Sequence, residues 1–279
     1  MTVDDYLERI GLKERPTIDL AGLTAVHRGH MFNIPYENLD VQLGHPVSVT
    51  VSNACDKIIR RKRGGWCYEM NGTLGWALEQ LGFKVTRLAG AVMRALHGEL
   101  ALCNHLVLKI DLPEGSYLGD VGFGEGSVDP IHLAPGDFSS NGFEFSLTQE
   151  ENNWWRVHKH LAAGTRSFDF KLEPAEDSCL AFRCAELQSL PDSIFVQNLI
   201  CYRHHQGGYW NLLGRVLRHV ESARPGEVQE RLIEDETDLL STLKETFHLD
   251  LPEAERIWPK VLARHEVVMQ EKSQAHGVA

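Results

Sequence analysis

The chain has few of the features that mark membrane, nucleic-acid-binding or disulfide-stabilised proteins. No apolar run is long enough to cross a bilayer, and the acidic start lacks the basic and apolar regions of a signal peptide. Lys and Arg number 28 against 39 acidic residues, so the formal net charge is −11 and no basic face for nucleic acid is expected. These absences predict a cytoplasmic protein that binds neither membrane nor nucleic acid.

Cysteine is also scarce. The six cysteines are thinly spread and include no Cys-x-x-Cys pair. In a reducing compartment such cysteines are expected to be free thiols rather than disulfides. The run 201–205, with one cysteine and two histidines, is the nearest approach to a metal-binding motif, but it lacks the second half that a zinc site needs. No metal site is predicted.

What the chain does have is the composition of an ordinary globular protein. Its 279 residues are 43% apolar and 24% charged, which allows a sizeable core in one large domain or in two to three smaller ones. No internal repeat and no low-complexity linker is present, so the domains are expected to pack together. Net charge leaves the oligomeric state open between a monomer and a homodimer.

Hydrophobic periodicity divides the chain into three parts. Apolar residues at helical spacing predict helices, first near the N-terminus, where Gly11 ends one, and again towards the C-terminus. Alternation of apolar and polar residues predicts short strands, as in a barrel or sandwich. The predicted helices are 4–10, 19–32, 52–63, 70–81, 187–198, 234–247 and 252–265; the predicted strands are 84–92, 106–112, 117–123, 143–147, 154–158, 167–172 and 208–213. Residues 34–40 are expected to be extended, and 271–279 to form a loose tail.

Residues 63–71, Arg-Gly-Gly-Trp-Cys-Tyr-Glu-Met-Asn, are the stretch around which the chain is organised. Two glycines lead to Cys67, and the helix 70–81 that follows is capped by Gly82. Cys67 therefore lies at or just before a helix N-terminus, where free amides and the helix dipole favour a thiolate and could stabilise an oxyanion. The alternative is that Cys67 is a packed, inert thiol.

A cysteine nucleophile needs a base and a group that orients the base. Among fourteen histidines, His105 opens the alternating strand, and Asp120 lies on the returning strand among glycines and a valine. The alternatives are a core or surface histidine and a turn or surface aspartate; Asp111 and Asp129 are competing carboxylates. A hairpin centred on residues 114 and 115 would also place His105 opposite residue 124 rather than Asp120, so a bulge or another route is required.

Glycines crowd residues 122–126, Gly-Phe-Gly-Glu-Gly. No Lys-Ser or Lys-Thr follows, and the spacing is not that of a dinucleotide-binding loop, so a phosphate site is not predicted. Two readings are open: a close backbone approach to the active cysteine with Phe123 as a pocket wall, or a plain turn.

Together these motifs resemble the arylamine N-acetyltransferase family. The resemblance rests on 63–71 with Cys67, on Asn104-His105-Leu106, and on 120–124, Asp-Val-Gly-Phe-Gly. Upstream, 34–39 and 6–11 match the early motifs of the family, so order and spacing agree over 5–130; a weaker match extends to Ser193-x-Phe195-x-x-Asn198.

The resemblance implies an α+β multidomain fold with a papain-like cysteine-enzyme core. Residues 1–85 would form an N-terminal helical bundle that carries the Cys67 loop. Residues 86–190 would form an antiparallel β-barrel that carries His105 and Asp120, and residues 191–279 would form a C-terminal α/β lid. The region 181–225 is the hardest to align, so the lid and the residues that contact coenzyme A stay unassigned.

The resemblance also implies a reaction. Acetyl-CoA would donate its acetyl group to Cys67, and the acetyl-Cys67 thioester would pass it to a small aromatic amine, hydrazine or hydroxylamine, with His105 as base and Asp120 orienting it. Phe123 and Gly124 would contact substrate. Four further residues would be structural supports: an ion pair between Arg63 and Glu37, and the hydrogen-bonding residues Glu69 and Asn71.

Three alternatives stay open at this point. A papain- or transglutaminase-like cysteine hydrolase would resolve the acyl-enzyme with water, and a polyketide-type amide synthase would use the same fold on a larger acyl chain. A catalytically silent binding protein would keep the fold without the chemistry. The acceptor amine and the acyl-chain preference are not predicted.

Overall fold

The computed structural model describes residues 1–161, 164–224 and 226–276. Its N-terminal part is helical, with five α-helices: α1 Val3–Arg9, α2 Leu20–Asn33, α3 Leu39–Leu43, α4 Val51–Cys55 and α5 Cys67–Leu81. Side-chain caps begin the first two, because the Thr2 hydroxyl accepts from Asp5 N–H and the Asp19 carboxylate from Gly22 N–H. Gly82 ends α5 in the left-handed region at φ +97°. The predicted helix over 70–81 is confirmed, and it begins at Cys67.

The predicted helix over 52–63 is only partly correct. The α-helical part, α4, ends at Cys55, and a π-helical turn, η1, covers Asp56–Arg60. Three consecutive residues of this turn, Lys57, Ile58 and Ile59, are buried. A regular α-helix would place three consecutive residues on different faces, and the wider π-turn permits their common burial.

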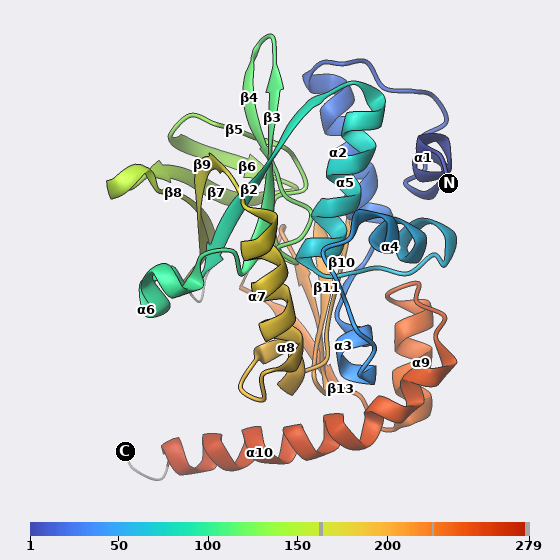
Figure 1. Ribbon diagram of the computed structural model, residues 1–279. Helices are drawn as coiled ribbons and strands as arrows, with labels where there is room; N and C mark the ends of the chain where they lie inside the picture. Colours follow the sequence, from blue (N-terminus) through green and yellow to red (C-terminus); the bar gives the residue numbers. More distant parts are fainter. Residues whose placement is uncertain (162–163, 225, 277–279) are drawn as a thin grey trace.

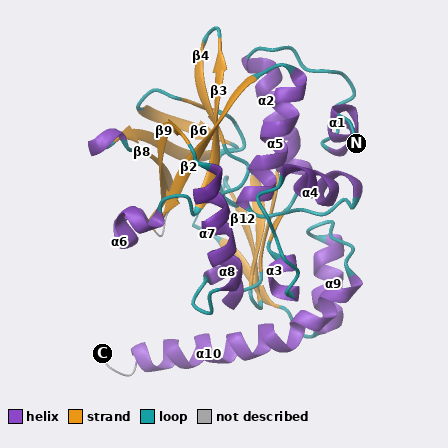
Figure 2. Cartoon of the chain, in the orientation of Figure 1, coloured by secondary structure: helices purple, strands orange, loops and turns teal. Residues whose placement is uncertain are grey.

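An eight-stranded antiparallel sheet forms the middle of the chain, and in Figures 1 and 2 it curls beside α2 and α5. Its strands are, in spatial order, β5 Ile131–His132, β4 Gly115–Gly119, β3 His105–Leu112, β2 Lys84–Val92, β9 Gly164–Pro174, β8 Trp155–Leu161, β7 Phe143–Gln149 and β6 Gly136–Ser140. The predicted strands 84–92, 106–112, 143–147, 154–158 and 167–172 all lie in this sheet. The order begins at β5 and ends at β6, so the sheet is a curled half-barrel rather than a closed barrel.

The predicted strand 117–123 ends early. β3 and β4 are joined by a tight turn, with Leu112 opposite Gly115, and pairing stops where Leu108 meets Gly119. Asp120 therefore lies just past the strand, in a loop that turns off the sheet. A regular hairpin would not place Asp120 opposite His105. Because the chain leaves β4 before Asp120, the position of the Asp120 side chain does not depend on the pairing of β3 with β4.

A five-stranded antiparallel sheet joins the two ends of the chain. Its order is β1 Tyr36–Glu37, β10 Ile200–His205, β11 Gly208–Leu213, β12 Val216–Glu221 and β13 Val228–Leu232. β1 pairs with β10 through Tyr36 and Tyr202. Of these strands only β11 was predicted. The extended stretch at 34–40 thus becomes the edge of a sheet built mainly from C-terminal residues.

The remaining helices are α6 Arg94–His97, α7 Asp177–Ser189, α8 Ile194–Gln197, α9 Glu236–Glu245 and α10 Trp258–His276, with 3₁₀ turns η2 Gly98–Ala101, η3 Glu151–Asn153 and η4 Pro252–Ile257. The predicted helix 187–198 is the end of α7, a break, and α8. In Figure 1 α10 runs along the bottom of the molecule towards the C-terminus. The loose tail predicted from 271 is wrong as far as His276, and residues 277–279 lie outside the described part.

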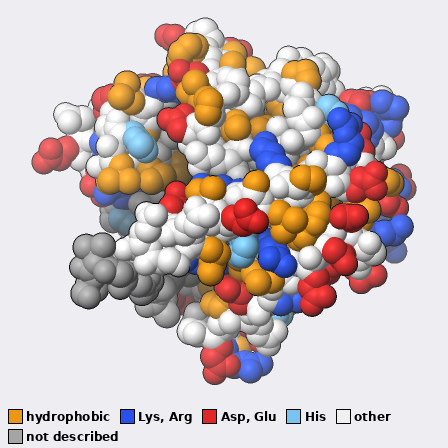
Figure 3. Space-filling view, turned by 90° about the horizontal axis from the view of Figure 1, so that it is seen from below, with side chains coloured by type: hydrophobic (Ala, Val, Ile, Leu, Met, Phe, Trp, Pro, Cys, Tyr) orange, Lys and Arg blue, Asp and Glu red, His pale blue; other side chains and the backbone are white. Residues whose placement is uncertain are grey.

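The surface seen from below Figure 1 mixes acidic, basic and apolar side chains (Figure 3). No single-sign field dominates this face, although the chain as a whole is acidic. Among the described residues, no helix combines the length and apolar character needed to cross a membrane.

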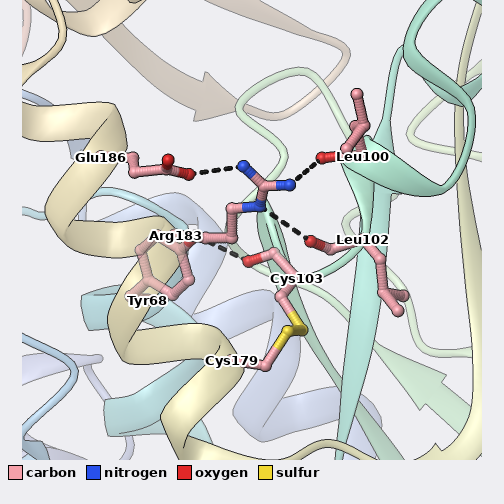
Figure 4. Close-up of a disulfide and its surroundings, with 7 residues drawn as sticks. All are labelled: Tyr68, Leu100, Leu102, Cys103, Cys179, Arg183 and Glu186. Atoms are coloured by element: carbon pink, nitrogen blue, oxygen red, sulfur yellow. Dashed lines mark hydrogen bonds and ion pairs between the residues drawn. A yellow bond between two sulfur atoms is a disulfide. The ribbon is translucent and has the colours of Figure 1, made fainter.

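The structure contains one disulfide among its described residues, between Cys103 and Cys179 (Figure 4). The prediction that all six cysteines are free thiols is therefore wrong for this pair. Cys103 precedes β3 and Cys179 lies in α7, and their Cα atoms are 6.0 Å apart.

Hydrogen bonds surround the disulfide. The Tyr68 hydroxyl donates to the Cys103 carbonyl at 2.8 Å, and the Arg183 guanidinium donates to the carbonyls of Leu100 and Leu102. Sequence spacing could not show that α7 passes the start of β3.

Removal of this disulfide is expected to lower stability. The two cysteines are separated by 76 residues, and crosslinks that close loops of this length contribute roughly 2–4 kcal/mol. The Cys103→Ser/Cys179→Ser variant should therefore unfold at lower urea concentration than the wild type. Thiol alkylation of the unfolded wild type checks the premise: it should label the four free cysteines, 55, 67, 184 and 201, without reductant, and all six with it. Labelling of six without reductant would contradict the crosslink.

Candidate active site

Cys67 is the first residue of α5, and glycines bring it into position. A Cβ on Gly64 would lie 1.9 Å from the Pro35 carbonyl oxygen, so only glycine lets the two segments meet. Gly65 carbonyl accepts from Glu37 N–H at 2.9 Å, and Gly65 pairs with Tyr36. The two motifs at 34–39 and 63–71, distant in sequence, thus form one structural unit that fixes the start of α5.

His105 and Asp120 form a buried hydrogen-bonded pair. His105 Nε2 lies 2.8 Å from Asp120 Oδ2. The other carboxylate oxygen accepts from Asn71 Nδ2 and from Gly122 N–H, each at 2.8 Å. Burial alone raises the pKa of Asp120, but the charge of His105 and these hydrogen bonds outweigh it and lower the pKa. The carboxylate is therefore held ionised, with one oxygen fixed on the histidine.

Cys67 lies near this pair, because the N–H of Leu106, the residue after His105, bonds its sulfur. Asn71, one turn further along α5, donates to the Leu106 carbonyl at 2.6 Å and accepts from Val121 N–H at 2.9 Å. It thereby ties the helix both to the strand of His105 and to the loop of Asp120. A Cβ on Gly122 would lie 2.7 Å from Cys67 Cα. The structure thus brings the three sequence-predicted residues together.

The surroundings of the Cys67 sulfur have two opposing effects. Burial raises the pKa of the Cys67 thiol, while the backbone N–H groups of Leu106 and Tyr68 lower it; the net direction is upward. Cys67 is 3% exposed and His105 2% exposed. A thiolate in such a place requires a nearby cation and hydrogen-bond donors. The two backbone amides supply the donors.

Aromatic rings cover His105 on the other side. Its ring centroid lies 5.9 Å from that of Phe123 and 5.1 Å from that of Phe168, and the two phenylalanines are 4.8 Å apart. A small cavity of about 10 Å³ is lined by Asp120, Phe123 and Phe168 and also reaches Lys159 and Arg166. Phe123 thus lines a cavity beside His105, and its contact with substrate stays a prediction.

Gly124, the second predicted substrate contact, has a different environment. It adopts the left-handed conformation at φ +78°, and a Cβ there would lie 2.8 Å from the Tyr202 ring. Its carbonyl accepts from His204 Nε2 at 2.6 Å. Gly124 thus joins the loop to β10.

The predicted ion pair between Arg63 and Glu37 is present, with Nη2 and Oε1 2.8 Å apart. It belongs to a larger buried network. Lys57 Nζ lies 2.9 Å from Glu69 Oε2 and 2.8 Å from Asp40 Oδ2, and Arg63 also contacts Asp40 at 3.1 Å. Burial raises the pKa of Glu69 to about 7 against the pull of Lys57. Two cations and three carboxylates are enclosed under the start of α5.

Several residues of the site were missed from the sequence. Lys57 and Asp40 complete the charged network, Phe168 covers His105, and His27 of α2 contacts the backbone of Asp120. Lys57 falls within a predicted helix that ends in a basic run, and nothing in its spacing separates the buried lysine from the exposed Arg60. For Phe168 and His27 the only signal is an apolar or helical pattern, which predicts burial and not position.

The arrangement of a cysteine at a helix start, a histidine and an aspartate on an α+β scaffold is typical of one class of protein, the enzymes with a cysteine nucleophile. Among the described residues, no group of three or more His, Cys, Asp or Glu side chains is arranged to hold a metal ion.

Comparison with known proteins identifies the family. The pattern of a family described as N-acetyltransferase matches residues 19–256. The arylamine N-acetyltransferase of Mycolicibacterium smegmatis is 35% identical over 258 residues, covering 90% of this chain and 93% of the relative. The pineal gland isozyme NAT-3 of Gallus gallus, also an arylamine N-acetyltransferase, is 32% identical over 278 residues, covering 90% and 95%.

Solved structures agree with the sequence comparison. The M. smegmatis arylamine N-acetyltransferase superposes with a TM-score of 0.85 at 33% identity, covering 94% of this chain and 97% of that one. The Mycobacterium marinum enzyme in complex with CoA also gives 0.85, at 27% identity, covering 93% and 98%. The chain belongs to the arylamine N-acetyltransferase family, and it is an acyltransferase.

Replacement of Gly122 by alanine is expected to disrupt this site more than the fold. The added methyl group would meet Asn71 Nδ2 and Cys67 Cα at 2.7 Å each. Because Asn71 also holds Asp120, the Cys67, His105 and Asp120 groups should move apart, and activity should fall by roughly 10²-fold or more. Initial rates of acyl transfer and the thermal midpoint measure the two effects. Gly126→Ala, whose Cβ would meet nothing nearer than 3.4 Å, is the matched control and should stay near wild-type activity.

Proposed function

We propose that the protein transfers an acetyl group from acetyl-CoA to an arylamine, arylhydrazine or arylhydroxylamine through an acetyl-Cys67 thioester. The observation that carries the proposal is the bond between His105 and Asp120 at 2.8 Å beside the cysteine that begins α5. A CoA complex of a family member supports the choice of donor.

In the first half-reaction His105 takes the proton of Cys67 Sγ, and the resulting thiolate attacks the thioester carbonyl of acetyl-CoA. Because burial raises the pKa of the Cys67 thiol, the proton leaves only as His105 becomes an imidazolium next to the sulfur. Asp120 stabilises that imidazolium and fixes its tautomer. The bond from carbonyl carbon to CoA sulfur breaks, and the CoA thiolate leaves with the proton from His105.

In the second half-reaction the amine nitrogen attacks the acetyl carbonyl of acetyl-Cys67. His105 accepts the proton that the nitrogen loses, the bond to Sγ breaks, and the Cys67 thiolate is regenerated. The N–H groups of Leu106 and Tyr68, which point at Sγ, stabilise the thiolate that attacks and departs. Exchange between thioesters is nearly balanced and transfer to an amide is downhill, so a cysteine carrier suits both steps.

The aromatic pocket gives the acceptor its place. Phe123 and Phe168 pack against each other and flank His105, and a planar amine stacked on these rings would present its nitrogen to the histidine. Stacked and edge-to-face ring contacts favour a flat aromatic acceptor over an aliphatic amine. We assign both phenylalanines, and not Gly124, to the acceptor side.

The domain assignment stands as part of this proposal: residues 1–85, 86–190 and 191–279, with a papain-like core formed where the first two meet. It is supported by the sources of the site, since Cys67 comes from the helical part, and His105 and Asp120 from the eight-stranded sheet and its loop. The pairing of β1 with β10 then links the first part to the last.

The test is the intact mass of the protein after brief mixing with acetyl-CoA alone, followed by peptide mapping. One acetyl group on Cys67, discharged by an aromatic amine such as an anisidine to give the acetylated amine, is expected. Discharge by water at the same rate as by amine would favour a cysteine hydrolase. An adduct formed only by longer acyl donors would favour an amide synthase. If no adduct forms and no CoA is released, the proposal is overturned.

A further inference from the structure

His27 is a fully buried histidine that lies outside the predicted site and touches it. It belongs to α2, in the N-terminal helical part, and its side chain is 0% exposed. Its Nδ1 lies 2.9 Å from the Val128 carbonyl oxygen, and its Nε2 lies 3.1 Å from the backbone nitrogen of Asp120. The ring thus bridges the two ends of the loop that follows β4.

The partners of His27 determine its tautomer. A carbonyl oxygen can only accept, so Nδ1 must carry a hydrogen and donate it to Val128. A backbone N–H can only donate, so Nε2 must be bare and accept from Asp120. Both contacts are satisfied by one neutral tautomer and by no other form of the ring. Burial lowers the pKa of His27, which agrees with a neutral ring.

The position of the Asp120 backbone determines where the Asp120 carboxylate lies. One carboxylate oxygen contacts His105, and the other is held by Asn71 and Gly122. Gly122 and Asp120 belong to the same loop, so their bond cannot place that loop in space. Asn71 anchors the loop from α5, and His27 anchors it from a second helix, α2.

We propose that His27 is a positioning residue for the acyl-transfer site: its Nε2 holds the Asp120 backbone so that the carboxylate stays on His105. The inference rests on the proposed function, because it takes His105 and Cys67 to react as an imidazolium and a thiolate. His27 touches neither substrate nor sulfur and acts through Asp120.

Other charged groups near His27 shape any pH profile. Asp129 lies close enough to act on the ring and is paired with Arg28 at 2.5 Å, and Asp120 faces the ring directly. On the reacting side, Cys67 and His105 face Asp120. His27 in turn acts on Asp129, and the Asn and Gln variants at position 27 remove that influence alike.

The experiment measures the rate of Cys67 alkylation by iodoacetamide against pH, together with single-turnover acetylation by acetyl-CoA. In His27→Asn the amide reaches the position of Nδ1 and can keep the Val128 contact, but it loses the acceptor for Asp120 N–H. In His27→Gln the longer side chain can place an oxygen where Nε2 lies. His30→Asn is the matched control, since His30 lies one turn further along α2, is equally buried, and bonds the Tyr6 hydroxyl at 2.9 Å.

His27→Asn is expected to slow alkylation near neutral pH by about tenfold or more, because the imidazolium loses part of its carboxylate partner. Its reactivity should instead rise only above the pH of an ordinary thiol, about 8.5, because burial raises the pKa of the Cys67 thiol. Acetylation should slow in parallel. His27→Gln should recover most of the rate. His30→Asn should lower the thermal midpoint and leave the shape of the pH profile as in the wild type.

Two outcomes separate the failures. If the wild type itself shows neither neutral-pH alkylation of Cys67 nor acetylation, the proposed function falls. If the wild type shows both, and the profile of folded His27→Asn superposes on that of the wild type or of His30→Asn, the role of His27 is refuted. Equal slowing of His27→Asn and His27→Gln with an unchanged profile would also refute it, since that result marks a packing defect.

Discussion

Cys67→Ser is expected to lose acyl transfer by a factor on the order of 10⁴ or more while the protein stays folded. A serine oxygen in place of Sγ keeps the size of the side chain but is far less acidic and nucleophilic, and His105 cannot generate an alkoxide as it generates a thiolate. The thioester intermediate would become an ester, which is a poorer acyl donor. Turnover of acetyl-CoA with an aromatic amine measures the loss, and intact mass after acetyl-CoA shows whether any acyl-enzyme forms.

The chain offers a matched control for this change. Cys184 is a buried free thiol, and its ionised form would raise the pKa of Cys67. Its Sγ lies 3.8 Å from the Val47 carbonyl oxygen. Cys184→Ser keeps a donor for that carbonyl and should leave activity within a few-fold of the wild type. Substantial turnover by Cys67→Ser, or equal losses in both variants, would contradict a covalent role for Cys67.

The predictable part of this site is the part that lies in local sequence. Glycines before Cys67 and the periodicity after it indicate a helix start. One of these glycines, Gly64, lies so close to the Pro35 carbonyl oxygen that no side chain would fit there. His105 at the start of an alternating strand is a local signal of the same kind. The pairing of β3 with β4 stops at Gly119, just before Asp120, which periodicity could not show.

The unpredictable part depends on contacts between distant segments. His27 and Asp120 are 93 residues apart, and nothing in a helical pattern shows which buried histidine meets a catalytic loop. Cys103 and Cys179 pair only because α7 passes β3. β12 and β13 were missed for a related reason: their residues alternate little in burial, and β13 is exposed throughout. Local periodicity indicates whether a residue is buried. It does not indicate which distant segment packs against that residue.

Replacement of Lys57 is expected to lower the free energy of unfolding more than the other substitutions considered. Its ammonium is 2% exposed and contacts Glu69 at 2.9 Å and Asp40 at 2.8 Å. In Lys57→Met the same volume stays filled, but three carboxylates, those two and Glu37, are left with Arg63 as their cation. Loss of one partner from a buried ion pair costs about 3–5 kcal/mol. Urea unfolding followed by circular dichroism should show a loss of this size.

The charged network also gives this loss a pH dependence. The folded pKa of Glu69, about 7, lies above its ordinary value of 4.5, so the native state binds more protons between these values. The contribution of Glu69 is therefore most favourable below pH ~4.5 and is lost as the pH rises through about 7. Without Lys57 the carboxyl should hold its proton to still higher pH. Lys57→Met should accordingly be less destabilised, relative to wild type, at pH 5 than at pH 8.

Two comparisons make the Lys57 result specific. Lys244 pairs with Asp250 at the surface, with both side chains about two-thirds exposed, and Lys244→Met should change stability by less than about 1 kcal/mol. Lys57→Met/Glu69→Gln removes one unpaired charge together with its partner and should regain part of the lost stability. If Lys57→Met unfolds at the same urea concentration as the wild type, or if the double variant is as unstable as the single one, the network is not what holds the start of α5, and Cys67 with it, in place.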